Sequence, residues 1–393
     1  MQLRSSLVPS ALAFALAASA PAGAQPAQAD LYIDVATHAM PGMGGIGALG
    51  RLAGNISGGT ASYGMARHPG MPGRYMDVAL DNRNQPGTPA RQAIPKGLRL
   101  GDRIELLPPE RGPRTDGSGA DGAPASMALA DGGPYTIRYY WGCGGQVRQG
   151  QPAEFTTSVR NGKPVSSGRM MTPRNVPQHG IDGGPRYALW PNPSHRKPVS
   201  TKASVVGAHH VTGDGVPEAM QFELGPDHDF LPELELDRET TDQGTRLSWN
   251  GVEGARAYFI HATAMDGGTI VMWSSSEDGY AGPELVDYLP EPLVAQWTKK
   301  RTLLGADARS CTIPPEVFAA GAPMVQMVAY GNERTIAQPR PADAARDWRP
   351  TWNVRVRSKS TAMLMPSGAM TPGATQESAR PGAKGLLRGL FGG

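Results

Sequence analysis

The chain has 393 residues, of which 51 are glycine, 37 are proline and 19% are charged, and its formal net charge is +3. This small positive charge does not indicate a nucleic-acid-binding protein, and after the first two dozen residues no apolar run approaches the ~20 residues of a transmembrane helix. The frequent glycines and prolines favour many turns over long helices, and the length is enough for two domains.

Residues 1–24 have the pattern of a signal peptide for export. Arg4 precedes an apolar stretch at residues 7–20, and the small residues at positions 22–24 form a cleavage site. A second cleavage site after Ala29 is an alternative. The pattern predicts a periplasmic or secreted protein.

Residues 30–229 predict a first β-rich unit. Apolar and polar residues alternate in short segments between turn signals, which is typical of strands. Residues 108–134 are rich in Gly, Pro, Asp and Ser and predict a long exposed loop. The strands expected in this unit are 31–36, 74–80, 103–107, 135–141, 154–159, 200–207 and 219–224.

Residues 230–358 predict a second β-rich unit with one helix at residues 290–301. The last expected strand, 352–357, has one apolar and one polar face, which suits an antiparallel sheet that is half exposed to water. The strands expected here are 246–249, 258–262, 269–273, 309–313, 323–330 and 352–357.

Part of this second unit resembles a fibronectin type III domain. LSW at residues 247–249, a short turn with glycine, and AYFIHA at residues 257–262 are similar to the second and third strands of that family. VQMVAYGNE at residues 325–333 is similar to one of its later strands. Together with the strand pattern of the first unit, it predicts a mainly β fold with two β-sandwich-like domains. The resemblance itself implies that the second is fibronectin type III/immunoglobulin-like with a short helical insertion, and it implies nothing about function.

A second resemblance covers the whole chain. YYWGCG followed by GQP, together with GLLRGLFG near the end, resembles uncharacterised exported bacterial proteins. No activity carries over from them.

The two cysteines, Cys143 and Cys311, allow two interpretations. In the oxidising compartment that an exported protein reaches, they could form a disulfide between the two units. Alternatively, one is a buried thiol and the other lies in a turn. A nucleophilic Cys143 would need a neighbouring base, so a hydrolase with dispersed catalytic residues is one alternative function.

Methionine and histidine recur near the start of the mature chain. Thioether and imidazole ligands suit Cu(I), so a periplasmic copper-binding protein is another alternative function. The competing interpretation is that these methionines fill irregular loop packing. The candidate ligands are His38, Met40, Met43, Met65, His68 and Met71.

Residues 359–393 read as a flexible tail with an apolar end. Within residues 384–393, leucines and a phenylalanine would line one side of a short helix, which predicts docking on a partner or a membrane surface. Disorder of this segment is the alternative.

The sequence as a whole favours an exported, non-enzymatic binding or scaffolding protein. The expected partner is an envelope protein or another component of the cell surface, and no nucleic acid or transmembrane span is expected. The chain lacks the short motifs of serine hydrolases and phosphate-binding loops.

Overall fold

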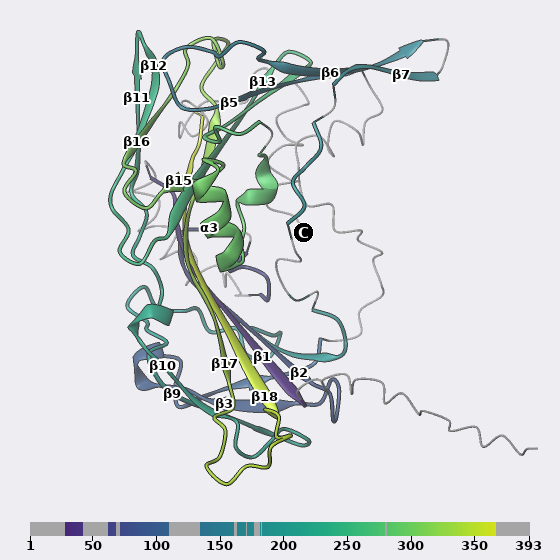
Figure 1. The fold of residues 1–393 in the computed structure, drawn as a ribbon, viewed down its shortest axis with the longest axis vertical. Coiled ribbons are helices and arrows are strands. Elements are labelled where there is room, and N and C mark those ends of the chain that lie inside the picture. Colours follow the sequence, from purple (N-terminus) through teal and green to yellow (C-terminus); the bar gives the residue numbers. More distant parts are fainter. Residues whose placement is uncertain are drawn as a thin grey trace, which may run out of the picture.

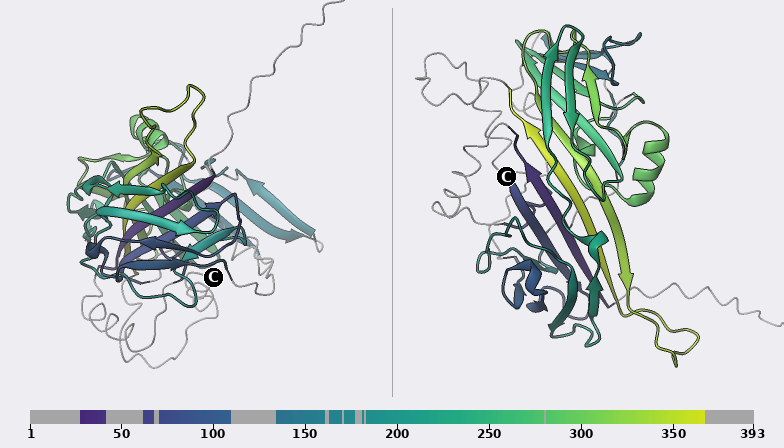
Figure 2. Two further views of the ribbon diagram at one scale, coloured as in Figure 1. Left: turned by 90° about the horizontal axis from the view of Figure 1, so that it is seen from below. Right: turned by 90° about the vertical axis from the view of Figure 1, so that its left-hand side faces the viewer.

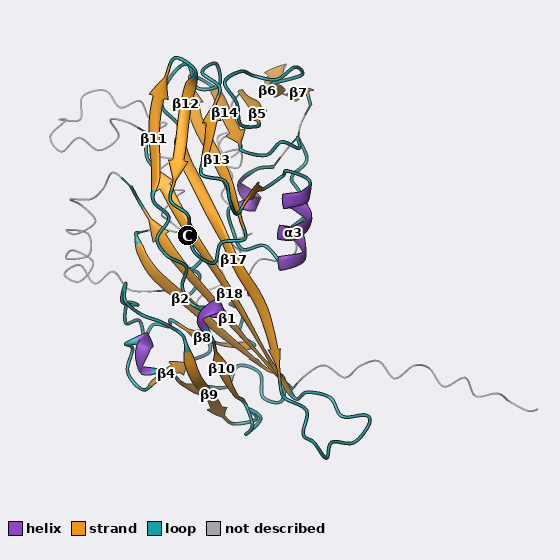
Figure 3. Ribbon diagram, turned by 60° about the vertical axis from the view of Figure 1, so that its left-hand side comes forward, coloured by secondary structure: helices purple, strands orange, loops and turns teal. Residues whose placement is uncertain are grey.

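The described part of the chain is mainly β, as the alternating sequence pattern predicts (Figure 3). The helix expected within residues 290–301 is confirmed as α3 (Glu291–Lys299), whose buried side carries Val294 and Trp297. The computed structural model describes residues 28–41, 62–67, 71–109, 134–160, 163–169, 171–176, 181, 183–279 and 281–366.

The largest sheet has eleven strands and runs the length of the molecule (Figure 1). Within it β1 (Ala29–Ala39) lies parallel to β18 (Trp352–Leu364), although these strands stand at opposite ends of the described chain. β2 (Gly73–Asn82) pairs with the other edge of β1, and β17 (Met324–Ala337) pairs with the other edge of β18.

The sheet continues on both sides of these four strands. Beyond β2 it ends at β8 (Tyr187–Trp190). On the other side, β14 (Thr269–Ser274) and β5 (Tyr135–Trp141) pair in parallel. The strands beyond β17 are, in order, β13 (Ala257–Asp266) with β15 (Leu304–Gly305) beside it, β14, β5, β6 (Ala153–Arg160) and β7 (Lys163–Gly168).

Two smaller sheets pack on the same face of the large sheet, one at each end (Figure 2). The upper sheet in Figure 1 has the order β11–β12–β16, and the lower one has the order β10–β9–β3–β4. The upper strands are β11 (Leu236–Thr241), β12 (Gly244–Trp249) and β16 (Ser310–Ile313). The lower strands are β3 (Ala90–Ala93), β4 (Arg103–Leu106), β9 (Gly207–Gly213) and β10 (Gln221–Leu224).

Hydrophobic residues fill the space between the layers at both ends. At the lower end, Leu31 and Ile33 of β1 and Val354 of β18 pack against the four-stranded sheet. At the upper end, Trp249 of β12 and Tyr258 of β13 belong to a second core. The resulting arrangement is sandwich-like at each end.

The opposite face of the large sheet is covered along its middle by the segment between β14 and β16. α3 and the short 3-10 helix Pro283–Leu285 pack there against Phe259 and Val328. The 3-10 helices Lys96–Leu98 and Pro226–His228 lie near the lower sheet (Figure 3). This covered face carries the charged residues that are described in the next section.

The large sheet takes strands from both sides of the expected boundary between residues 229 and 230. β1, β2, β5, β6, β7 and β8 come from the first expected unit, whereas β13, β14, β17 and β18 come from the second. The boundary therefore does not separate one sheet from another. Residues 1–27, most of the expected loop 108–134 and residues 367–393 of the expected tail lie outside the described residues. Residues 359–364, also expected in the flexible tail, belong to the buried strand β18.

One expected strand, 200–207, is wrong. Residues 201–202 form a turn, which the Ala203 N–H closes onto the Ser200 carbonyl at 2.9 Å, and residues 203–206 are irregular. Ser204 Oγ and the Val205 N–H both donate to the carboxylate of Asp229, at 2.6 Å and 3.0 Å. The strand of this region is β9, which begins at Gly207 and had not been expected. The backbone and side chains of this segment thus find their partners in Asp229 and not in a neighbouring strand.

Candidate functional site

A cluster of charged side chains lies on the face of the large sheet opposite to the two smaller sheets. The register places Asp34 of β1 beside Asp77 of β2 and Arg357 of β18. Lys359 follows two positions after Arg357 and therefore points to the same side. Each of the four side chains belongs to a residue that is at most 4% exposed. Charges buried to this degree require partners.

Asp34 and Arg357 form a bidentate ion pair. Arg357 donates from Nε to Asp34 Oδ1 at 2.8 Å and from Nη2 to Oδ2 at 2.5 Å. The ring of Tyr288 covers the guanidinium, with 4.5 Å between its centroid and Cζ. Burial disfavours the charge of Arg357, but the Asp34 carboxylate outweighs it and raises the pKa of Arg357. Such paired geometry is among the stronger hydrogen-bond arrangements in proteins.

Lys359 lies beside this ion pair and binds Arg67 and Asp287, which belong to the two segments that cover the charged cluster. Its Nζ donates to the carbonyl oxygen of Arg67 at 2.9 Å and to Asp287 Oδ1 at 3.0 Å. The Tyr288 ring centroid is 4.5 Å from the same Nζ. Arg67 donates from Nε to the second oxygen of Asp287 at 2.8 Å. Burial lowers the pKa of Lys359, because the ammonium loses its hydration.

Residues 62–67, called the strap here, cross the cluster and are fixed to it by side chains of the sheet. His38 Nε2 lies 3.1 Å from the carbonyl oxygen of residue 65. Asp77 Oδ2 accepts a hydrogen bond from the N–H of residue 66 at 3.0 Å, and Lys359 donates to the carbonyl of residue 67. Three consecutive strap residues therefore depend on three buried polar side chains.

Asp77 is the member of the cluster with an unsatisfied atom. Its Oδ1 is buried and has no hydrogen-bond partner within the described part of the chain. Burial, and then the neighbouring Asp34 carboxylate, raise the pKa of Asp77 to about 8. At neutral pH Asp77 therefore holds a proton, and the cluster contains a buried acid that can donate it.

Four of the six predicted copper ligands, His38, Met40, Met65 and Met71, lie within the described residues, and the hydrogen bonds of His38 and Met65 link no two of these ligating atoms. His38 is 2% exposed, and its ring nitrogens contact Thr361 Oγ1 at 2.7 Å and the carbonyl oxygen of Met65 at 3.1 Å. Burial lowers the pKa of His38 to about 3. Met65 Sδ accepts the N–H of Ser62 at 3.3 Å.

The remaining candidates are described only in part. Met40 is half-buried after β1, and Met71 is 45% exposed before β2. Met43 and His68 lie outside the described residues. Within the described ranges, no group of three His, Cys, Asp or Glu side chains is placed to hold a metal ion.

Cys143 and Cys311 are joined by a disulfide, with 5.2 Å between their Cα atoms. Cys143 follows β5 of the large sheet and Cys311 lies in β16, so the bond connects the two layers of the upper sandwich. The Cys143 sulfur is thus oxidised in this structure, whereas a nucleophilic role would need the thiolate.

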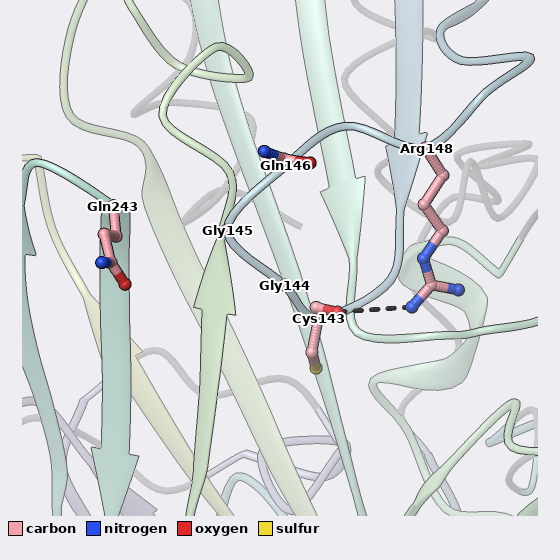
Figure 4. A pocket seen from close by; sticks show the side chains of 6 residues that line it. All are labelled: Cys143, Gly144, Gly145, Gln146, Arg148 and Gln243. Atoms are coloured by element: carbon pink, nitrogen blue, oxygen red, sulfur yellow. Dashed lines mark hydrogen bonds between the residues drawn. The ribbon is translucent and has the colours of Figure 1, made fainter.

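An open hollow of about 550 Å³ adjoins this disulfide (Figure 4). Arg148 at its rim donates to the Cys143 carbonyl oxygen at 3.3 Å and forms an ion pair with Glu277 at 2.8 Å. The guanidinium is therefore already paired, and the hollow offers mainly backbone and amide groups. Its lining consists of Cys143, Gly144, Gly145, Gln146, Arg148 and Gln243.

β6 and β7 form a hairpin that projects from the body of the molecule (Figures 1 and 2). β7 is the terminal strand of the large sheet, so its outer edge has no neighbouring strand in the described structure. Val159 and Val165 are 51% and 40% exposed. Because Val165 pairs with Ser158, the two valines point to opposite faces. Both faces of the hairpin therefore present apolar side chains to solvent.

The sequence interpretation missed the charged cluster. The polar face of residues 352–357 was expected to meet water, and this is wrong for Arg357, which is buried against Asp34. The available signal was a charged residue within otherwise apolar strands, as in LYIDVA and RYMDVAL.

No helix in the described ranges is both long and apolar enough to span a membrane. The predicted docking segment at residues 384–393 lies outside these ranges. Comparison of the chain with protein-family models, with curated proteins and with solved structures finds no match.

Proposed function

We propose that this chain is an exported, non-enzymatic protein of the bacterial envelope that binds or scaffolds another envelope protein through the β6–β7 hairpin. The observation that carries the proposal is the projection of this hairpin, with an open strand edge and exposed valines on both faces. An open strand edge offers unpaired backbone groups to which a strand of another chain can pair.

The strand order of the upper sandwich supports an immunoglobulin-like architecture. The sheet β11–β12–β16 faces β13–β17–β18. In chain order these strands would take the places of strands A, B and E on one side and C, F and G on the other. α3 would be an insertion between β14 and β16. Proteins of this architecture commonly use edges and loops for binding, which is an argument from fold alone.

Export is supported by the leader pattern and by the disulfide, because disulfides persist in oxidising compartments. Cleavage after Ala24 fits the backbone contacts better than cleavage after Ala29. The Gln28 N–H donates to the Thr351 carbonyl at 2.8 Å, and the Gln28 carbonyl accepts from the N–H of Arg83 at 2.8 Å. The later cleavage would remove Gln28 and these two bonds.

The test is photocrosslinking in intact bacteria that export the full chain. A photoreactive amino acid at position 165 should give a discrete covalent complex with an envelope protein. Position 265 is the matched control, since Met265 is 48% exposed on the β13–β14 hairpin of the same sheet. Val159→Ser combined with the reactive group at 165 should weaken the complex.

Two outcomes contradict the proposal. One is a set of complexes from position 165 that does not differ from the set at position 265. The other is fractionation that recovers the processed protein with the cytosol.

A further inference from the structure

The buried ion pair between Lys359 and Asp287 differs in kind from the others in the described structure. It is the pair that contains a lysine, whereas the other pairs contain arginine. The side chain of Lys359 is 0% exposed and that of Asp287 is 14% exposed. A lysine amine can become a nucleophile when it is desolvated, whereas an arginine guanidinium keeps its proton.

The amine and the carboxyl group are held in fixed positions by several partners. Lys359 Nζ is 3.0 Å from Asp287 Oδ1 and is also held by the Arg67 carbonyl and the Tyr288 ring. Arg67 Nε binds Asp287 Oδ2 at 2.8 Å. The oxygen that faces the amine and the oxygen that faces the guanidinium are therefore distinct.

We propose that Lys359 and Asp287 condense to an intramolecular isopeptide bond that joins β18 to the segment covering the charged cluster. This modification goes beyond the proposed function and does not depend on it.

The reaction is balanced by the atoms of the ion pair itself. Lys359 Nζ forms a bond to Asp287 Cγ, and the bond from Cγ to Oδ1 breaks. Two of the three ammonium protons leave with Oδ1 as water, and the third stays on the amide nitrogen. Oδ2 becomes the amide oxygen, and the Arg67 N–H stabilises the negative charge that develops on it. No oxidant, reductant or co-reactant is needed.

The proposal assigns the transfer of the proton from nitrogen to the leaving oxygen to Asp77. It binds the backbone of residue 66, and Lys359 binds the backbone of residue 67, so the two side chains contact consecutive strap residues. Asp77 Oδ1 has no partner in the described part of the chain. Burial and Asp34 raise the pKa of Asp77 to about 8, so it can exchange a proton near neutral pH.

Burial also supplies the driving force. Two charges held out of water carry a desolvation cost that a neutral amide does not. Fixed contact between the reacting groups replaces the high concentration that a bimolecular condensation would require. The lowered pKa of Lys359 increases the fraction of neutral amine.

The test is the intact mass of the purified, exported wild-type protein after reduction of its disulfide. The expected mass is one water lower than that of the processed sequence. Proteolysis should release one branched species that contains both Lys359 and Asp287. A wild-type protein of full mass, with the two peptides recovered separately, overturns the proposal without reference to any variant.

Variants then separate the chemistry from folding. Lys359→Arg keeps the positive charge and should show the full mass. Asp287→Asn should form the same amide with release of ammonia. Asp77→Asn should leave the far-ultraviolet circular dichroism spectrum unchanged. The fraction of molecules that contain the isopeptide bond should fall by about tenfold or more, as expected for loss of a general acid–base group. Unchanged condensation in Asp77→Asn would overturn the role of Asp77.

Discussion

Asp77 is the side chain through which pH acts most directly on the fold. Its pKa in the folded chain is about 8, because of burial and the Asp34 charge, and in the unfolded chain it is about 3.9. Between these values the folded state holds a proton that unfolding releases. The contribution of Asp77 to stability is therefore complete below the unfolded pKa and is lost as the pH rises toward about 8.

Asp77→Asn removes this titration. From about pH 5 to about pH 8, the free energy of unfolding of the wild type should fall relative to that of the variant by up to about 1.4 kcal/mol per pH unit. Urea unfolding followed by tryptophan fluorescence at several pH values measures the difference. Parallel curves for the two proteins would contradict a raised pKa at this site.

His38 and His261 make the folded state less stable as the pH falls, whereas Asp77 makes it less stable as the pH rises. Burial lowers their pKa values to about 3 and about 4, so both are neutral in the folded chain at neutral pH. Unfolded histidine takes up a proton below about pH 6.5. Their contribution to stability is thus lost as the pH falls from that value, and the fold should be most stable at intermediate pH.

The ion pair of Asp34 with Arg357 should be more sensitive to loss of one partner than to loss of both. Arg357→Met leaves the Asp34 carboxylate buried without its partner, which should cost about 3–5 kcal/mol. Adding Asp34→Leu should restore much of this loss, because an apolar pair of similar volume needs no solvation. A double-mutant cycle by urea unfolding measures both effects, and additive losses would argue against a direct buried pair.

Strands of the same sheet should differ in what they contribute to stability. Ile33 of β1 is 1% exposed in the lower core, and Ile33→Ala should cost about 2–5 kcal/mol. Val165 of β7 is 40% exposed, and Val165→Ser should change stability by less than about 0.5 kcal/mol. Amide hydrogen exchange should likewise be faster in β6–β7 than in β18. Equal protection of the two regions would show that the hairpin is not a separate arm.

Individual elements could be predicted from the sequence where local pattern and tertiary environment agree. β5 has the expected bounds Tyr135–Trp141, and α3 lies within the expected helix. β7 and β9 were missed, because KPVSSG and GAHHVTG lack the regular apolar alternation of a half-buried strand. Their place in a sheet is set by their neighbours.

The charged cluster could not be predicted for a related reason. Arg357 is 323 residues from Asp34 in sequence, and a charge inside an apolar strand does not show which residue will be its partner until the two strands are paired. The parallel pairing of β1 with β18 is itself a long-range contact that no local periodicity specifies. The sequence pattern thus identifies strands, whereas the site depends on their order in the sheet.

At the scale of the whole molecule, the disulfide covalently joins the large sheet to the three-stranded sheet of the upper sandwich. Cys143 and Cys311 are separated by 168 residues, so the bond restricts a large loop of the unfolded chain. Replacing both cysteines by serine should lower stability by about 2–5 kcal/mol. Differential scanning calorimetry should show a lower Tm for the variant. A reductant should lower the Tm of the wild type and leave the variant unchanged; a wild-type Tm that is insensitive to reductant would contradict this role.

The adjacency of β1 and β18 also has a consequence for biogenesis. A polypeptide emerges from the ribosome, or from a translocation channel, with its amino end first. β1 must then wait for almost the entire remaining chain before its parallel neighbour arrives. During this interval Asp34 has no Arg357 to neutralise it, and the middle of the sheet stays incomplete. A polypeptide truncated before Trp352 lacks β18 and could not complete the large sheet. Only chains that contain β18 can therefore reach the folded state.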